Sequence, residues 1–323
     1  MSTDYRRKDT PAPARVSIVP DPEMEPVAIT SAAKDDEDLL NRFWVALLVA
    51  FLGVVGTMLT ITGGNGGFQG VLVALLLHTV PGLAIGVVYR LRGLDLILSW
   101  FVGSLAVLIL CSLPMALTSF WHPRVMATLI LLASTAVAVW VACKRPPTLE
   151  ATWVRRTGRA MIGPIGLATA GFLVAVLAAA AQPQSPALYG AALAAGPLWF
   201  LGLGAIVFAV CWAFSSVGGR SWSIVLLATV VPMSQAVMYG TPTVQVAARH
   251  IGLVNLLIAN GGLDREAGIY QAYSGLFASS ALVQQAAGWP DLMMYAAVFG
   301  AVGAGVNCLA VTQLARYFVD DER

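Results

Sequence analysis

The residues whose chemistry could serve a reaction gather in one stretch of the chain, 241–290. This stretch contains Arg249, His250, Asp264 and Glu266, whereas the segments on either side of it are almost uncharged. A carboxylate can accept the proton of a hydroxyl group, and Arg beside His can stabilise an anionic leaving group such as a phosphate. One hypothesis is therefore group transfer from a phosphate-linked donor, with Asp264, Glu266 and His250 as catalytic candidates and Arg249 binding the substrate.

Three aromatic residues accompany these charged groups, namely Tyr270, Tyr273 and Trp289. Aromatic rings present a flat apolar face with a polar edge, which suits the stacking of sugar rings, so we expect these residues to bind a substrate. The same stretch also fits a plain loop. Asp264 suits the cap of a short helix, and its charged neighbours suit a face exposed to water.

His78 is the only ionisable side chain well inside an apolar segment, and it precedes Pro81 by three residues. A histidine within a membrane is a candidate for function, here substrate binding. The alternative is a neutral imidazole that bonds to a backbone carbonyl freed by the proline kink. Because no Asp or Glu lies mid-segment to pair with His78, a proton-coupled transporter is disfavoured.

The elements that must position these groups are apolar helices. Hydrophobic residues make up 58% of the chain and charged residues 11%, which excludes an ordinary soluble domain. The expected fold is an all-α polytopic membrane protein with about eight spanning helices and short outer amphipathic helices. The windows are Phe43–Thr62, Gly70–Tyr89, Leu96–Leu117, Met126–Cys143, Ala160–Ala180, Ala191–Phe214, Ser221–Tyr239 and Leu292–Leu314.

The basic residues predict the orientation, because loops rich in Lys and Arg stay in the cytoplasm. With the N-terminus inside, only Arg124, Arg249 and Arg265 of the 19 basic residues fall on the outer side. We therefore expect a multi-pass protein of the plasma (inner) membrane, with both termini in the cytoplasm.

The chain divides into four expected parts. Residues 1–41 should be a disordered cytoplasmic tail, because they are polar and lack an apolar period. Residues 42–240 should hold seven transmembrane helices, and 291–323 the last helix with a short cytoplasmic tail. Between them, 241–290 should form an outer loop, with an amphipathic helix over 244–259 and a stretch over 274–287 that lies in the interface or dips into the membrane.

The possible partners follow from composition and from the last span. The small residues Gly300, Gly303 and Ala304 share a face on which another helix can approach closely, within the chain or in a membrane protein partner. The net charge of +2 is too small to suggest nucleic acid. The four cysteines form no CxxC pair and no cluster at metal-binding spacing, so neither a metal nor a cofactor is expected.

The run "ARHIGLVNLLIANGGLDREAGIYQAYSGLFA", Ala248 to Ala278, resembles a segment of actinobacterial multi-spanning membrane proteins of cell-envelope polysaccharide biosynthesis. The order of the preceding spans, with "LLLHTVPGLAI" in the second, is also similar. The resemblance implies a distant relation to membrane glycosyltransferases of the C superfamily, which use polyprenyl-phosphate-linked sugars on the outer face. Those enzymes carry an acidic residue in the first outer loop, and Thr62–Gln69 here has none. We expect this chain to correspond to an N-terminal half or a shortened paralogue.

Three functions remain open on this basis. The first is a non-catalytic or partner-dependent subunit of cell-envelope glycan assembly. The second is a glycosyltransferase or polymerase that takes a polyprenyl-phosphate-linked sugar as donor. The third is a flippase or transporter of a lipid-linked glycan, which would need a cavity reaching the membrane midplane near His78.

Overall fold

The structure, a computed structural model, is all α-helical over the residues that it describes, which are 26–63, 66–144, 159–182, 194–215, 219–242, 245–264 and 274–318. Within this part, eight segments are long and apolar enough to cross a membrane: Arg42–Ile61, Gly67–Val88, Gly93–Thr118, Pro123–Lys144, Gly163–Ala180, Gly196–Ser215, Arg220–Tyr239 and Met293–Ala315. Each overlaps one predicted span. The protein is a multi-pass integral membrane protein, and the predicted fold class is confirmed.

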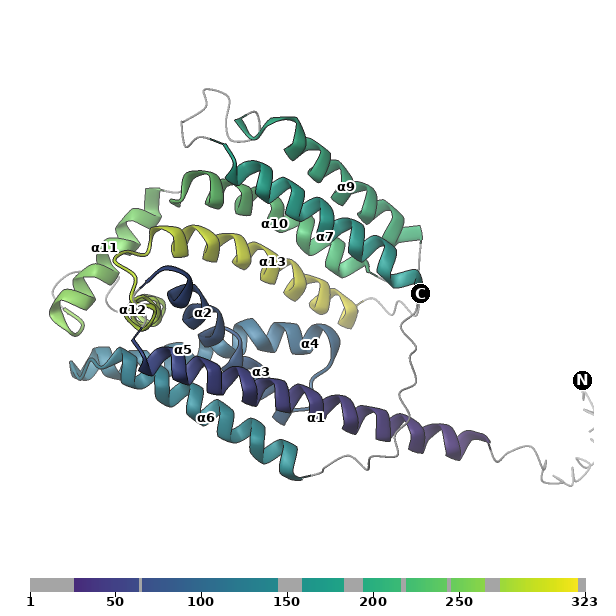
Figure 1. Ribbon diagram of the computed structural model, residues 1–323, viewed down its shortest axis with the longest axis horizontal. Helices are drawn as coiled ribbons and strands as arrows, with labels where there is room; N and C mark the ends of the chain where they lie inside the picture. The colour runs from purple at the N-terminus through teal and green to yellow at the C-terminus, as the bar shows by residue number, and fades with distance from the viewer. Residues whose placement is uncertain are drawn as a thin grey trace, which may run out of the picture.

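Most spans are single helices, whereas the second and third are each assembled from shorter pieces. The second span comprises α2 and α3, and the third comprises α4, the π-helical turn η1 and α5 (Figure 1). The elements are α1 (Pro26–Ile61), α2 (Gly67–Leu77), α3 (Val80–Val88), α4 (Gly93–Leu98), η1 (Ser99–Gly103), α5 (Ser104–Thr118), α6 (Pro123–Lys144), α7 (Arg159–Ala180), α9 (Gly196–Ser215), α10 (Arg220–Tyr239), α11 (Gln245–Asn260), α12 (Gly275–Ala287) and α13 (Met293–Phe318).

Helix α1 begins at Pro26, inside the segment 1–41 that the sequence predicted as a disordered tail. Proline is well suited to the first turn of a helix, because its missing N–H would have no partner there. Good helix formers follow, with no further proline in α1 and no glycine before Gly53. The helical boundary therefore differs from the prediction over 26–41, while residues 1–25 lie outside the described part.

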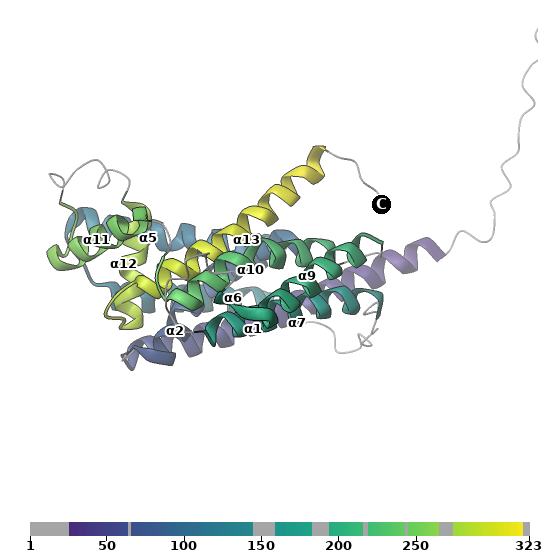
Figure 2. The same cartoon turned by 90° about the horizontal axis from the view of Figure 1, so that it is seen from above.

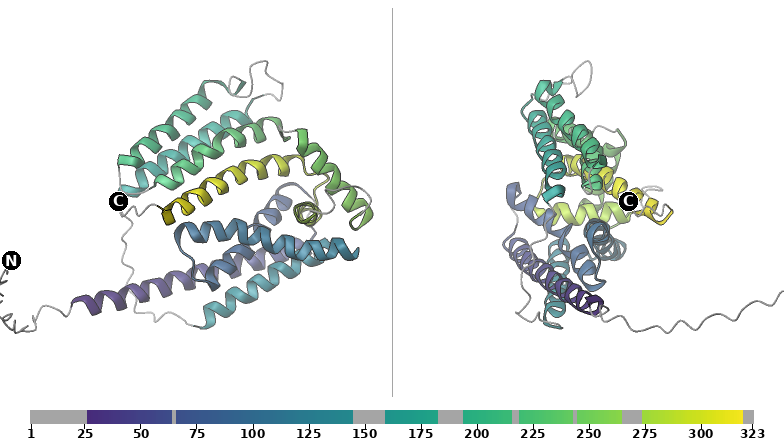
Figure 3. Two further views of the ribbon diagram at one scale, coloured as in Figure 1. Left: turned by 180° about the vertical axis from the view of Figure 1, so that it is seen from behind. Right: turned by 90° about the vertical axis from the view of Figure 1, so that its right-hand side faces the viewer.

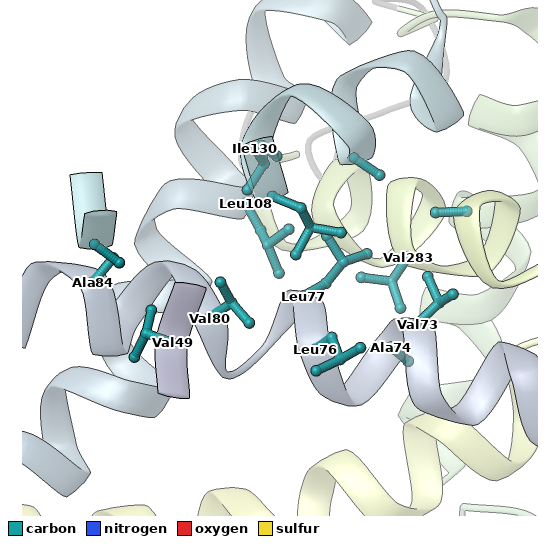
Figure 4. Packing of buried hydrophobic residues seen from close by; sticks show 14 of the residues in the cluster. Val49, Val73, Ala74, Leu76, Leu77, Val80, Ala84, Leu108, Ile130 and Val283 are labelled. Carbon is teal, nitrogen blue, oxygen red and sulfur yellow. The ribbon is translucent and has the colours of Figure 1, made fainter. Parts of the chain in front are cut away.

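The helices form two groups on either side of α13 (Figures 1 and 3). The N-terminal group consists of α1 to α6 with α12, and its core of apolar side chains is drawn from most of these helices (Figure 4). Leu77, Val80, Leu108 and Leu131 are fully buried in that core. The C-terminal group consists of α7, α9 and α10, whose core is rich in alanine.

Helix α13 packs mainly against α10, where Gly305 lies against Thr229. Only about a fifth of its spanning window is buried (22%), much less than in the second span. From above, the C-terminal part of α13 leads away from α10 (Figure 2). One long face of α13 is therefore left without cover from the described helices.

Helix α12 covers most of the stretch that was expected to lie in the interface or to dip into the membrane. It lies across the direction of the spans, so it is seen end-on in Figure 1 and lengthwise in Figure 3, right. It packs against α2, α5, α6 and α11. Its buried residues are Ala278, Ser279, Ala281, Leu282, Val283, Gln284, Ala286 and Ala287. The small side chains of this helix let four neighbours approach, which makes α12 part of the protein interior.

Candidate functional site

Two of the predicted catalytic residues, His250 and Asp264, belong to the end of the molecule that carries α11 and α12, which we call the α11 end. Helix α11 is amphipathic as predicted, because Ile251, Val254 and Leu257 are buried on one face. Arg249 is exposed near the start of this helix, and His250 is half-buried with its ring 5.2 Å from that of Phe277 in α12. The two neighbours thus differ, since His250 is supported by α12 and Arg249 reaches outward.

The turn after α11 determines where the backbone places Asp264. Gly261 has a φ of 63°, a left-handed conformation that ends this helix. Leu263 then donates its backbone N–H to the carbonyl of Ala116 at 3.0 Å, which anchors the turn on α5. Asp264 is half-buried directly beyond this anchor. Glu266, Tyr270 and Tyr273 lie outside the described residues, so their predicted roles stay predictions.

His78 lies at the break between α2 and α3. Its Nδ1 is 2.9 Å from the carbonyl oxygen of Ala74, so this nitrogen carries the proton and donates it. The Ala74 carbonyl also accepts the backbone N–H of His78 at 3.1 Å, so it is not a carbonyl freed by the proline kink, as the alternative expected. The other ring nitrogen, Nε2, then accepts the hydroxyl proton of Tyr295 from α13 at 3.1 Å. Both nitrogens of a neutral imidazole are therefore occupied.

An aromatic cluster encloses this pair. The His78 ring centroid lies 6.1 Å from Phe101, 5.8 Å from Tyr295 and 6.1 Å from Phe299. Trp289 joins the cluster through its contact with Tyr295 at 5.9 Å. Thus two predicted binding residues, His78 and Trp289, are brought together through Tyr295. The transport alternative, which needs a cavity reaching the membrane midplane near His78, stays a prediction.

Tyr295 and Phe299 were not singled out in the sequence, although a signal for them existed. They are four residues apart on the last span and so share one helix face. A tyrosine hydroxyl inside a span needs a hydrogen-bond partner, and His78 was the only ionisable side chain well inside a span. Pairing the two from sequence alone would still have required knowledge of which spans are neighbours.

The broken second span is held by the π-helical turn of the third. The amide N–H of Gly82, in the first turn of α3, donates to the Ser104 hydroxyl at 2.8 Å, and the Ser99 hydroxyl donates to the Gly82 carbonyl at 2.9 Å. The first turn of a helix leaves N–H groups without helical partners, and these are costly in a membrane. A Cβ atom at position 82 would overlap the carbonyl oxygens of Ser99 and Trp100, so only glycine fits there.

A second polar contact ties α13 to the N-terminal group at the opposite end. The Gln313 side-chain amide donates to the Asp95 carboxylate of α4 at 2.8 Å. Together with the His78–Tyr295 pair, this bond joins α13 to the broken second and third spans near both of its ends. Helix α13 is therefore fixed between the two groups by specific hydrogen bonds as well as by apolar packing.

The uncovered face of α13 contains the small residues that were predicted to face a partner. Gly300 is exposed, and Gly303 and Ala304 are half-exposed. A methyl group added to either glycine would meet no other part of the described chain within 4 Å. Asn307 is exposed on the same face, near the middle of the span Met293–Ala315. No hydrogen bond joins its side chain to the part of the chain that the structure describes.

The His78 cluster, the α11 end and the α13 face differ in the groups that they offer to a ligand or partner. The His78 cluster uses its hydrogen bonds internally, and its aromatic side chains are half-buried. The α11 end offers an exposed guanidinium, an imidazole and a carboxylate at the edge of the membrane. The α13 face offers close backbone approach and an amide that no described residue bonds. Comparison with known proteins adds no assignment, because no protein-family model, curated protein or solved structure matches the chain.

Proposed function

We propose that this protein is a non-catalytic, partner-dependent subunit of cell-envelope glycan assembly, which docks on another membrane protein through the uncovered face of α13. The observation that carries the proposal is the exposed amide of Asn307 near the middle of a span. An amide facing hydrocarbon has no water to bond with, so a polar partner on a neighbouring helix stabilises it.

The rest of the face supports the same use. Gly300 and Ala304 are separated by three residues, the spacing of small residues that lets two membrane helices approach closely. Large apolar residues flank them further along the helix, since Val311 and Leu314 are 67% and 58% exposed. A transmembrane helix of another protein, with a hydrogen-bonding side chain opposite Asn307, fits this combination.

The placement in glycan assembly rests on the resemblance of residues 248–278 and on the predicted orientation, which puts the α11 end outside the cytoplasm. Envelope polysaccharides are built from lipid-linked sugars at that surface in the proteins that the chain resembles. A subunit bound beside such an enzyme would present Arg249 and His250 at the same level as the growing glycan.

The test is affinity purification of the tagged full-length chain from its own membranes in mild detergent, with quantitative mass spectrometry. We expect one envelope glycosyltransferase to co-purify in stoichiometric amount and to be lost with Gly300→Leu and with Asn307→Leu. The matched control is Gly204→Leu, because Gly204 is also an exposed helical glycine with nothing within 4 Å. Recovery of the same enzyme from all variants, or of the chain with only further copies of itself, would overturn the proposal.

A second candidate function is glycosyl transfer by this chain itself, and the position of Arg249 on α11 supports it. The burial of one face of this helix holds Arg249 outward at the membrane edge, where a lipid-linked phosphate would lie. The purified chain would then transfer sugar from a polyprenyl-phosphate donor without any partner. Arg249→Ala and Asp264→Asn would abolish that activity, and a chain that is inactive alone would rule this candidate out.

A further inference from the structure

Helix α10 contains a second amide that no described residue bonds. Gln235 lies within the span Arg220–Tyr239, and its side chain is half-buried. No hydrogen bond joins this side chain to the residues that the structure describes, which is also true of Asn307 in α13. The neighbouring Ser234, by contrast, is buried and donates to the carbonyl of Val230 at 2.6 Å. An amide within a span needs a hydrogen-bond partner, so Gln235 calls for one outside the described helices.

The contact between α10 and α13 gives the spacing of the two amides. The helices lie side by side and run in opposite directions, because α10 ends at the α11 end of the molecule and α13 begins there (Figures 1 and 2). Gly305 meets Thr229 at this contact, since a Cβ atom at position 305 would lie 2.7 Å from the Thr229 hydroxyl oxygen. Gln235 follows Thr229 by six residues, and Asn307 follows Gly305 by two. In antiparallel helices these displacements add, so the amides are about 12 Å apart along the helix axes.

The two amides also lie on the same side of this helix pair. Residues that are exposed or half-exposed form one row on each helix: Ala228, Val231 and Gln235 on α10, and Gly300, Ala304, Asn307 and Val311 on α13. Each row comes one residue before the row that makes the contact, as Ala228 precedes Thr229 and Ala304 precedes Gly305. A two-fold axis perpendicular to their common plane relates two antiparallel helices, and it keeps equivalent rows on one side of that plane. The two rows therefore form one continuous surface.

We propose that the partner presents a single transmembrane helix, which lies over the contact between α10 and α13 and bonds both Gln235 and Asn307. This inference rests on the proposed function, and it adds α10 to the partner surface. The partner helix carries two hydrogen-bonding side chains seven or eight residues apart, because about 12 Å equals two helical turns and places both on one face. Between the amides, the small side chains of Ala228 and Ala304 let that helix approach closely, and Val231, which is 43% exposed, adds apolar contact.

The first test is photocrosslinking of the full-length chain in its own membranes, with benzoylphenylalanine in place of one residue at a time. Val231 on α10 and Ala304 on α13 lie at nearly the same level, because they are displaced from the contact in the same direction by two residues and by one. We expect both positions to capture the same protein, with both crosslinks on one of its helices when the products are mapped by mass spectrometry. Leu201 is the control and should not capture it, since this residue is 67% exposed on α9, away from the contact.

The amide of α10 is tested separately, by the affinity purification described for the proposed function. Gln235→Leu should lower recovery of the partner about threefold, the effect of one hydrogen bond between membrane helices. Gln235→Met replaces it if that variant fails to fold. Met233→Leu is the matched control and should change nothing, because Met233 is also half-exposed on α10 but lies outside the row of Gln235.

The outcomes separate this inference from the proposed function. Capture from Ala304 without capture from Val231, or full recovery of the partner with Gln235→Leu, would leave the α13 face as the docking site and overturn the role of α10. Crosslinks on two different helices of the partner would also overturn the inference. If Ala304 captures no protein, the proposed function fails, and the inference fails with it.

Discussion

The two helical groups on either side of α13 are built by different means. The C-terminal group uses continuous helices with small residues, as where α7 and α9 approach at Gly171 and Gly202. The N-terminal group uses interrupted helices, a π-helical turn and the crossing helix α12, and it joins them with side-chain hydrogen bonds. Continuous helices need only side chains of complementary shape in order to pack. An interrupted helix in a membrane must also have hydrogen-bond partners for the backbone groups that the break frees. This difference explains why serine, threonine and histidine concentrate around Gly82.

The largest expected effect comes from adding one methyl group at the tightest point of each group. Gly82→Ala should cost about 3 kcal/mol or more, because the new Cβ meets backbone oxygens that cannot move aside. Gly202→Ala should cost a similar amount at the α7–α9 contact. Gly204→Ala is the control and should be neutral or slightly stabilising, since Ala is the better helix former. Unfolding midpoints in detergent, followed by tryptophan fluorescence, measure all three.

If the unfolding midpoint of Gly82→Ala equals that of the Gly204→Ala control, the π-helical turn shifts to make room for the methyl group. The N-terminal group would then be the more deformable one, and the hydrogen bonds around Gly82 would not fix its geometry.

The next prediction compares one tryptophan hydrogen bond in each group, and its expected effect on stability is intermediate in size. The two bonds differ in how deeply the indole is buried. In the C-terminal group the buried Trp199 donates to Ser234 at 2.9 Å, and in the N-terminal group the half-buried Trp121 donates to Gln285 at 2.7 Å. Ser234→Ala leaves a buried indole N–H without a partner and should cost about 2 kcal/mol. Gln285→Met should cost about 1 kcal/mol, because water can reach Trp121.

Thermal unfolding with Ser215→Ala as the control checks this order, since the Ser215 hydroxyl is exposed. A larger loss of stability for Gln285→Met than for Ser234→Ala would mean that the bond between Trp121 and α12 contributes more to stability than the bond of the more deeply buried indole.

The smallest effects should arise where α13 joins the N-terminal group. Tyr295→Phe removes the bond to His78, and Gln313→Ala removes the bond to Asp95, so each should cost about 1 kcal/mol. The two sites lie near opposite ends of α13, and their effects should therefore add. The midpoints of both single variants and of the double variant test this. A loss in the double variant far beyond the sum would show that α13 separates from the N-terminal group as one unit.

Much of the architecture could be predicted, because the membrane imposes it. The eight spans and the amphipathic α11 follow from apolar length and helical period. Helix α1 begins at Pro26 in the structure, whereas the charge density around Asp35 led us to expect a disordered tail there. The packing of α12 against four other helices was not predicted, because small apolar residues suit an interface and an interior equally well.

The candidate sites were predicted only in part. A bond from His78 to a backbone carbonyl was predicted as an alternative, but the acceptor is the Ala74 carbonyl, which also keeps its helical hydrogen bond, rather than a carbonyl freed by Pro81. The second bond of His78, to Tyr295, joins residues far apart in the chain and depends on which helices pack together.

The sequence by itself determined that this chain is a helical membrane protein, where its spans lie and which polar groups they contain, because hydrophobic length and period are local properties. Only the tertiary structure decided which of those groups are satisfied. It paired His78 with Tyr295 and left Asn307 facing outward, because hydrogen bonding between spans depends on which helices are neighbours and on how they are rotated. Those are set by packing over the whole molecule.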